Sequence, residues 1–204
     1  MHRSNPDYDR EAEAIRAQLP KCHRCAVIGS ASFWGRDSAE ICRAVGRDLA
    51  RFDDMALITG GVPGAGETVG RSFFSERESL GVPANVYHVL PRGASAWDYG
   101  LTLFGGDSMG ERREILARLA RVYVAIEGGP GTEHEATVAA QQGAAVIPVG
   151  RSGGASRDIH ARHQSPVTGL EAKWQSLGDT SIDIQRIASS VCLLVKAVAH
   201  RTEP

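Results

Sequence analysis

The 204-residue sequence has no long apolar run and almost no net charge. Without about 20 consecutive apolar residues, it predicts no membrane-spanning helix. With a formal net charge of −1, the protein has no excess positive charge that would attract it to nucleic acid or to an anionic membrane, so we predict neither as a partner. The first residues lack the apolar segment of a secretory signal peptide, and we therefore expect a cytoplasmic protein.

Complete sets of metal ligands are also missing. Cys22 and Cys25 have the C-x-x-C spacing of a zinc or redox half-site, but no second pair follows. Redox motifs of this spacing usually begin a helix, whereas this one leads into an apolar run typical of a strand. His160 and His163 are a lone pair in a polar segment. We therefore predict no metal site and interpret the cysteines as structural.

Two nucleotide-binding signatures are absent. No Gly-Lys pair precedes a serine or threonine, which excludes ATP hydrolysis of the P-loop type. Residues 64–70 miss the G-x-G-x-x-G dinucleotide fingerprint by one residue, and they follow the second apolar run instead of the first.

What the sequence does contain is an alternation of short apolar runs with helix-like segments. The runs predict strands at residues 25–29, 55–59, 86–90, 122–126 and 145–149. Helical periodicity predicts helices at residues 8–18, 41–52, 67–80, 109–120, 132–142 and about 180–201, with Thr180 and Asp183 as a capping box. Residues 91–108 and 150–165 are expected to be loops. The alternation predicts one α/β domain over residues 1–204, with its core at about 22–150, and a Rossmann-like parallel sheet with helices on both faces.

Three glycine-bearing turns follow predicted strands, at residues 29–35, 60–67 and 127–135. The carboxyl ends of parallel strands meet at one edge of the sheet, where ligands bind. Glycine lets backbone N–H groups turn toward a ligand, and the helix that follows adds the positive end of its dipole. The three turns together predict a pocket for an anion or a nucleotide.

Ser108 lies in a G-x-S-x-G sequence, the nucleophile elbow of many serine hydrolases. Asp158 and His160 or His163 follow in the chain order of a hydrolase triad. The same serine can instead cap the helix that starts at Met109, with Glu111 as the third residue of a capping box. A serine hydrolase that uses Ser108 stays a third hypothesis.

The residues MGERR at 109–113 and GGPGTEHE at 128–135 resemble a known paired signature. In the LOG family of cytokinin-activating phosphoribohydrolases it reads M-H-x-R-K and, after a strand, P-G-G-x-G-T-x-x-E. The resemblance runs from about Cys25 to Val149. Glu127 replaces the proline of the signature, Gly110 its histidine and Arg113 its lysine. These departures place the chain in the wider LOG-like Rossmann superfamily, which also contains molybdenum-cofactor carrier proteins.

The resemblance implies a site for a nucleoside 5′-monophosphate. It assigns Arg112 and Glu135 as the catalytic residues, with Glu135 facing the ribose. The glycine turns and the resemblance together assign a set of phosphate- or ligand-binding residues: Gly29, Ser30, Gly60, Gly61, Gly64, Met109, Gly128, Gly129, Gly131 and Thr132. Thr132 and Glu135 also have the T-x-x-E spacing of a capping box. Glu127 would repel a phosphate, so it is turned away, paired with an arginine, or a sign of a different ligand.

The expected reaction is hydrolysis of an N-glycosidic bond to free base and ribose 5-phosphate; the alternative is a non-catalytic carrier of a nucleotide or of the molybdenum cofactor. Pyridoxal phosphate needs a Schiff-base lysine. Lys21, Lys173 and Lys196 all lie outside the glycine turns, and we predict no cofactor. The resemblance implies a homodimer, for which Ile115, Leu116 and Leu119 could supply the contact.

Overall fold

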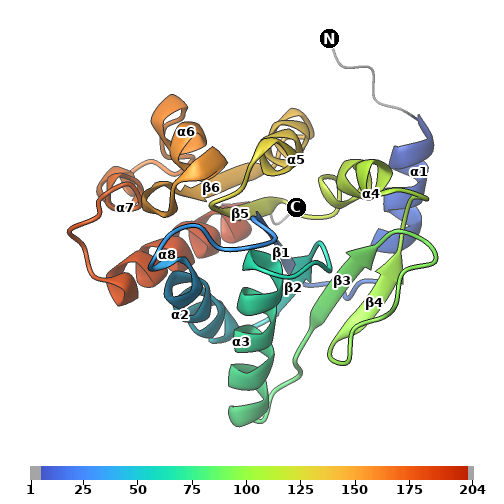
Figure 1. Ribbon diagram of the computed structural model, residues 1–204. Coiled ribbons are helices and arrows are strands. Elements are labelled where there is room, and N and C mark those ends of the chain that lie inside the picture. The colour runs from blue at the N-terminus through green and yellow to red at the C-terminus, as the bar shows by residue number, and fades with distance from the viewer. Residues whose placement is uncertain (1–5, 202–204) are drawn as a thin grey trace.

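Six parallel strands form one sheet in the computed structural model, which describes residues 6–201 (Figure 1). The strands are β1 His23–Gly29, β2 Met55–Thr59, β3 Val86–Leu90, β4 Leu101–Phe104, β5 Val122–Ile126 and β6 Ala145–Val149. Their order across the sheet is β4-β3-β2-β1-β5-β6. The predicted α/β class and the Rossmann-like parallel sheet are confirmed.

Helices cover both faces of this sheet (Figure 1). One face carries α2, α3, α7 and α8, and the other carries α1, α4, α5 and α6. The helices are α1 Pro6–Arg16, α2 Ser38–Ala50, α3 Ala65–Ser79, α4 Met109–Leu116, α5 Pro130–Gln141, α6 Gly154–Arg162, α7 Glu171–Ser176 and α8 Ile184–Arg201, with a 3-10 turn, η1, at Gly150–Ser152. None of the described helices is both long enough and apolar enough to cross a bilayer.

Strand β1 explains why the apolar runs were so clear in the sequence. Cys25 and Val27 pack against the α2, α3 and α8 layer, whereas Ala26 and Ile28 pack against the α1, α4 and α5 layer. All four side chains are buried. Strands covered on both faces have continuous apolar sequences, because both sets of alternating side chains enter a core. Burial also raises the pKa of the Cys25 thiol, so this cysteine is structural.

The strand order reverses direction between β1 and β5. From β1 the chain adds strands on one side as far as β4, and it then returns to place β5 on the other side of β1. Gly29 at the end of β1 lies opposite Ile126 at the end of β5. The segments that leave these two strands diverge to opposite sides of the sheet, which opens a crevice at their carboxyl ends.

Several predicted boundaries were wrong. Residues 101–104, expected to be loop, form the edge strand β4, whose alternation is weak because Leu101 and Phe104 are exposed. The loop expected at residues 150–165 contains η1 and α6, and α7 follows. The last helix begins at Ile184, where the Asp183 carboxylate accepts the Arg186 N–H. Thr180 is therefore not its cap.

The apolar stripe proposed for dimer contact is not available to a partner. Ile115, Leu116 and Leu119 are at most 1% exposed. They belong to the core cluster that also contains Ala12 and Ile15 of α1. Helix α1 covers this stripe, so a homodimer would need another surface.

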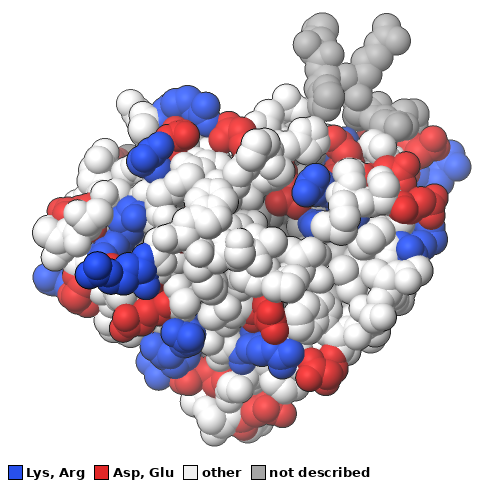
Figure 2. All heavy atoms as spheres, viewed as in Figure 1, with Lys and Arg blue, Asp and Glu red and all other residues white. Residues whose placement is uncertain are grey.

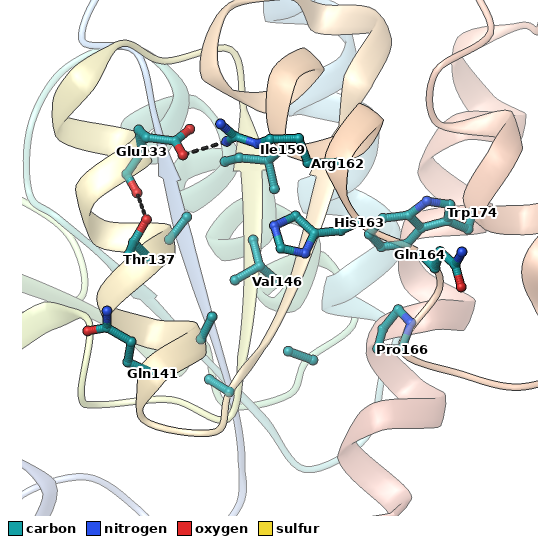
Figure 3. Close-up of a pocket in the computed structure, with 14 residues that line it drawn as sticks. Glu133, Thr137, Gln141, Val146, Ile159, Arg162, His163, Gln164, Pro166 and Trp174 are labelled. Carbon is teal, nitrogen blue, oxygen red and sulfur yellow. Dashed lines mark hydrogen bonds and ion pairs between the residues drawn. The ribbon is translucent and has the colours of Figure 1, made fainter. Parts of the chain in front are cut away.

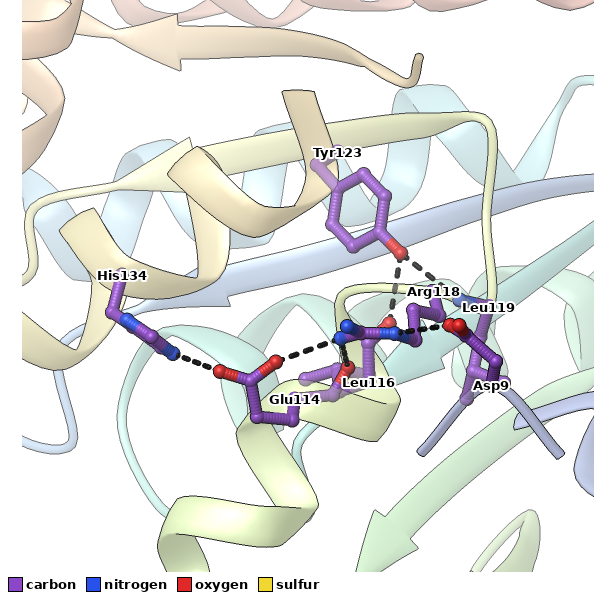
Figure 4. Close-up of polar contacts among 7 residues, drawn as sticks. All are labelled: Asp9, Glu114, Leu116, Arg118, Leu119, Tyr123 and His134. Atoms are coloured by element: carbon purple, nitrogen blue, oxygen red, sulfur yellow. Dashed lines mark hydrogen bonds and ion pairs between the residues drawn. The ribbon is translucent and has the colours of Figure 1, made fainter. Parts of the chain in front are cut away.

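A polar cluster with Arg118 buried at its centre joins α1, α4 and α5 (Figure 4). The Arg118 guanidinium donates to Asp9 of α1 and to Glu114 of α4, and the other Glu114 oxygen lies 2.6 Å from Nε2 of His134 on α5. The Tyr123 hydroxyl donates to the Leu116 carbonyl. The cluster fixes the position of α4 relative to α5, the two helices that carry the catalytic candidates.

Replacement of Tyr123 by phenylalanine tests whether its hydroxyl stabilises the end of α4. The hydroxyl also accepts the buried N–H of Leu119 and the N–H of Ala120, both at 3.1 Å. Without it the Ala120 N–H loses its partner and the Leu119 N–H keeps only the Leu116 carbonyl, so we expect the free energy of unfolding in urea to fall by roughly 1–3 kcal/mol. Tyr87→Phe is the matched control, because the Tyr87 hydroxyl has no hydrogen bond within residues 6–201. Equal stability of the two variants would contradict the role of Tyr123.

Candidate functional site

A cavity of about 310 Å³ lies at the carboxyl ends of β1, β2 and β5. Its walls come from the segments after β1 and β2 and from the first turns of α4 and α5. The volume is at the lower end of the range for small-molecule sites. The cavity therefore occupies the crevice that the strand order predicts.

Most of the predicted site residues line this cavity: Gly29, Ser30, Gly60, Met109, Arg112, Gly129, Gly131, Thr132 and Glu135. Gly61, Gly64 and Gly128 do not. Gly64 has φ +85, and a Cβ there would lie 2.2 Å from the Ser30 carbonyl oxygen. Gly128 has φ +90, and its Cβ would lie 2.3 Å from Oγ1 of Thr132. Gly64 lets the turn after β2 approach the turn after β1, and Gly128 lets the chain after β5 fold closely against Thr132; both roles are structural.

Arg112 and Glu135 form a buried ion pair in the cavity wall. Nη1 of Arg112 lies 2.8 Å from Oε1 of Glu135, and the two side chains are 3% and 7% exposed. The guanidinium packs against Gly60, where a Cβ would lie 2.7 Å from Nη1. Nε of Arg112 is buried without a hydrogen-bond partner in the described part of the chain. Such unpaired donors are rare and costly, and they call for an explanation such as a ligand or a water.

The capping role considered for Glu135 was wrong. Helix α5 begins at Pro130, its N-cap is Gly129, and no side chain makes the cap hydrogen bond. Thr132 is therefore the third residue of the helix, and the Glu135 carboxylate is directed to Arg112. Burial raises the pKa of Glu135, and the neighbouring Arg112 and Arg113 oppose this shift. A buried carboxylate with a perturbed pKa beside a cavity is typical of a functional site.

Arg113 is a cavity residue that the sequence analysis did not assign. A Cβ on Gly131 would lie 3.0–3.1 Å from the Arg113 guanidinium, so this cation covers the first turn of α5. No carboxylate among the described residues forms an ion pair with it. The signature has lysine at this position, and the retained positive charge was the signal that could have identified Arg113.

Glu127 is turned away from the α5 turn and binds the segment after β1. Its carboxylate is fully buried and accepts hydrogen bonds from the Ser30 hydroxyl (2.6 Å), the Trp34 N–H (3.2 Å) and the Gly35 N–H (2.7 Å). The residue has φ +55, a left-handed conformation that is uncommon outside glycine. Of the three alternatives weighed for Glu127, the structure gives the first, and no arginine within residues 6–201 forms an ion pair with it.

The glycine turn after β2 is held by buried His88. The Gly61 N–H donates to Oγ1 of Thr59, which lies 2.7 Å from Nδ1 of His88, and Nε2 of His88 lies 3.1 Å from the Tyr99 carbonyl oxygen. Because a carbonyl only accepts, Nε2 carries the proton and Nδ1 accepts from Thr59. Burial lowers the pKa of His88 to about 4, although the bond to Tyr99 opposes the shift.

The lowered pKa of His88 predicts a pH dependence of stability. From its ordinary value of 6.5 down to about 4, the unfolded chain binds a proton at this residue and the folded chain does not. Stability is therefore lost as the pH falls through this window, by up to about 3 kcal/mol. We expect His88→Gln to flatten this part of the curve in urea unfolding series. Parallel curves for wild type and His88→Gln would show that His88 is not responsible.

Ser108, Asp158 and His160 do not form a catalytic triad, so the structure does not support the serine hydrolase hypothesis. The Ser108 hydroxyl accepts the Glu111 N–H at 3.2 Å and caps α4, as the alternative interpretation expected. Nε2 of His160 lies 2.9 Å from the Trp174 carbonyl oxygen, and Asp158 pairs with Arg157. Each of these groups has a structural partner of its own.

A second cavity of about 570 Å³ lies between α5, β6 and the segment from α6 to α7 (Figure 3). Figure 3 shows Val146 and Ile159 toward its interior and the Glu133–Arg162 ion pair at its edge. It shares no lining residue with the first cavity. Although it is larger, it contains neither a glycine turn nor a buried ion pair, so the smaller cavity is the candidate site.

The parallel sheet, its switch point and the glycine turns define a LOG-like Rossmann protein. Residues 23–175 match the model of the SLOG cluster4 family. The match covers well over half of the chain, and the protein belongs to this family. No match was found among curated proteins.

Solved structures share the fold. TM1055, a structural genomics target, has a TM-score of 0.57 and 25% identity over 68% of this chain and 81% of its own. The molybdenum cofactor carrier protein of Chlamydomonas reinhardtii has a TM-score of 0.59 and 20% identity over 86% of this chain and 99% of its own. The molybdenum cofactor binding protein of Rippkaea orientalis has a TM-score of 0.56 and 19% identity over 70% of this chain and 84% of its own. At these identities the two cofactor-binding proteins show the fold alone.

Proposed function

We propose that this protein is a phosphoribohydrolase that cleaves the N-glycosidic bond of a nucleoside 5′-monophosphate. The observation that carries the proposal is the buried Arg112–Glu135 pair in the wall of the cavity, close to the first turn of α5. Its products are a free base and ribose 5-phosphate. No cofactor is needed, because water supplies the hydroxyl group for the sugar and a proton for the base.

The start of α5 supplies the site for the phosphate. The N–H groups of Gly131 and Thr132 have no backbone partner in the described part of the chain, as expected for a first helical turn. The helix dipole adds a partial positive charge, and Arg113 adds a full one. The negative charge of Glu127 is bound away from this turn by the segment after β1.

The ion pair supplies the chemistry at the sugar. Cleavage of an N-glycosidic bond gives the sugar the character of an oxocarbenium ion, and a carboxylate stabilises that charge or orients the attacking water. Glu135 is the carboxylate for this role. Arg112 keeps it in place and can hold an anionic group of the substrate or the departing base.

The first prediction concerns the phosphate. Charge-assisted hydrogen bonds contribute about 1.5–3 kcal/mol each, so a nucleoside monophosphate should bind more than tenfold better than its nucleoside in calorimetry. Arg113→Met should remove most of this preference, because it deletes the charge at the α5 turn. Arg43→Met, an equal charge change on the exposed face of α2, is the control. Equal affinities of wild type for nucleotide and nucleoside would exclude the phosphate site.

The second prediction concerns Glu135. Glu135→Gln should reduce base release on the order of a hundredfold or more, about 2.7 kcal/mol at the transition state, because the amide cannot stabilise a developing cation. It should also cost stability, about 3 kcal/mol, since the buried Arg112 loses its counter-charge. Base release by chromatography, nucleotide affinity and urea unfolding are measured on the same preparations.

Glu133→Gln is the matched control for this experiment. Glu133 lies on the same helix and pairs at the surface with Arg162, so activity and stability should be close to wild type. Arg112→Lys should behave like Glu135→Gln in activity, because a point charge does not copy a guanidinium fork. Near-normal base release by Glu135→Gln would remove Glu135 from the mechanism.

A non-catalytic carrier of a nucleotide or of a pterin cofactor is the second candidate. The observation that favours it is the closed Arg112–Glu135 pair, in which each charge already has its partner. The fold shared with molybdenum cofactor carriers is compatible with it. Tight binding across a panel of nucleotides without any base release would favour this candidate over the hydrolase.

A further inference from the structure

Trp34 is the most exposed of the large apolar side chains among the described residues, at 62%. It lies between β1 and α2 and lines the candidate cavity together with Met109, which is 36% exposed. A single exposed aromatic side chain is common on protein surfaces. Three further features make this one part of a built site.

The first feature is the backbone anchor of Trp34. Its N–H group donates to the buried carboxylate of Glu127, and so does the N–H of Gly35. Ser30, at the start of the same segment, adds a third hydrogen bond to this carboxylate. A fully buried charge thus fixes the segment from both sides of the indole-bearing residue.

The second feature is the seat of the indole ring. A Cβ on Gly154 would lie 2.8 Å from Cζ3 of Trp34, and a Cβ on Gly129 would lie 3.8 Å from Cη2. The ring therefore rests over Gly154 and next to Gly129, and a side chain at position 154 would displace it. Backbone from two other segments thus supports the ring beside the cavity.

The third feature is the uncharged surface around it. Figure 2 shows few charged side chains across the centre of the face that carries the segment after β1, with Lys, Arg, Asp and Glu grouped toward the edges. A planar heteroaromatic ring stacks well in such surroundings, and stacking on an aromatic side chain contributes about 1–3 kcal/mol per base.

We infer that Trp34 is the surface on which the planar ring of the ligand stacks, and that Glu127 is the residue that positions it. This inference rests on the proposed function, in which the phosphate binds at the start of α5. It adds the recognition of the other end of the ligand. A purine base and a pterin share the ring chemistry required, so the experiment includes both.

The experiment compares Trp34→Ala and Trp34→Phe with wild type. Adenosine 5′-monophosphate and ribose 5-phosphate are titrated by calorimetry; adenine and a pterin are titrated by tryptophan fluorescence. We expect Trp34→Ala to weaken the nucleotide about tenfold, the lower end of a stacking contribution, and to leave ribose 5-phosphate unchanged. Trp34→Phe should stay within a few-fold of wild type. Leu193→Ala, an exposed apolar truncation on α8, is the control.

Fluorescence provides a direct readout. Ring-containing ligands should quench wild type, ribose 5-phosphate should not, and Trp34→Phe should lose the quenching because Trp97 and Trp174 lie away from the cavity lining. Glu127→Gln should lower the ratio of nucleotide to ribose 5-phosphate affinity, an effect that a general loss of stability would not produce.

The experiment distinguishes failure of the stacking surface from failure of the proposed hydrolase function. Unchanged nucleotide affinity in Trp34→Ala, or an equal loss for ribose 5-phosphate, overturns the stacking surface even if base release is intact. If Trp34→Ala selectively loses ring binding and the wild type releases no base, the stacking surface is supported and the hydrolase function is excluded. Absence of quenching by every ring ligand overturns the inference.

Discussion

The carboxylate of Glu127 is the interaction on which the arrangement of the candidate site depends. It is fully buried where β1 and β5 end side by side, and a buried charge is tolerated only when hydrogen-bond donors surround it. Ser30, Trp34 and Gly35 supply those donors, so the segment after β1 is folded around the carboxylate. In dinucleotide-binding sheets the corresponding turn offers its amides to a pyrophosphate. Here the Trp34 and Gly35 amides bind a carboxylate of the protein itself, which is why the start of α5 is the place proposed for a bound anion.

Burial of the Arg112–Glu135 pair costs desolvation free energy, so the pair is better explained by function than by stability. Removing two charges from water costs several kcal/mol per ion, and a buried pair often stabilises a protein less than apolar side chains of similar volume would. This pair moreover leaves Nε of Arg112 without a partner among the described residues. The neighbouring core cluster of the α1, α4 and α5 layer consists of apolar side chains, and the cavity wall could have been closed in the same way. A cavity that must recognise a polar, charged molecule is a physical reason to retain them.

The sequence predicted the strands that are buried on both faces and the turns that follow them, because those features are local. It missed β4, since an edge strand shows little alternation. It misread Thr132 and Glu135 as a capping box, since the T-x-x-E spacing does not reveal that Pro130 starts the helix two residues earlier. The partner of Glu127 could not be predicted, because Ser30 lies 97 residues away and only the strand order joins them. Arg113 could have been assigned to the cavity from the sequence, because the signature has another cation, lysine, at this position.

Glu127, the departure at the proline of the LOG signature, joins the segment after β1 to the segment after β6. The Glu127 N–H donates to the Ser152 hydroxyl and its carbonyl accepts from Ser156, so its backbone holds the glycine-rich segment after β6, whereas a proline there would have no N–H to donate. Its side chain holds Trp34, and Gly154 of that same segment makes room for the indole ring. Arg113, another departure, keeps a positive charge beside the first turn of α5, whereas Glu127 is bound to the segment that carries Trp34. For the proposed function, this means that the exchange of proline for Glu127 alters the segment proposed to meet the base, while the positive charge proposed to bind the phosphate is retained.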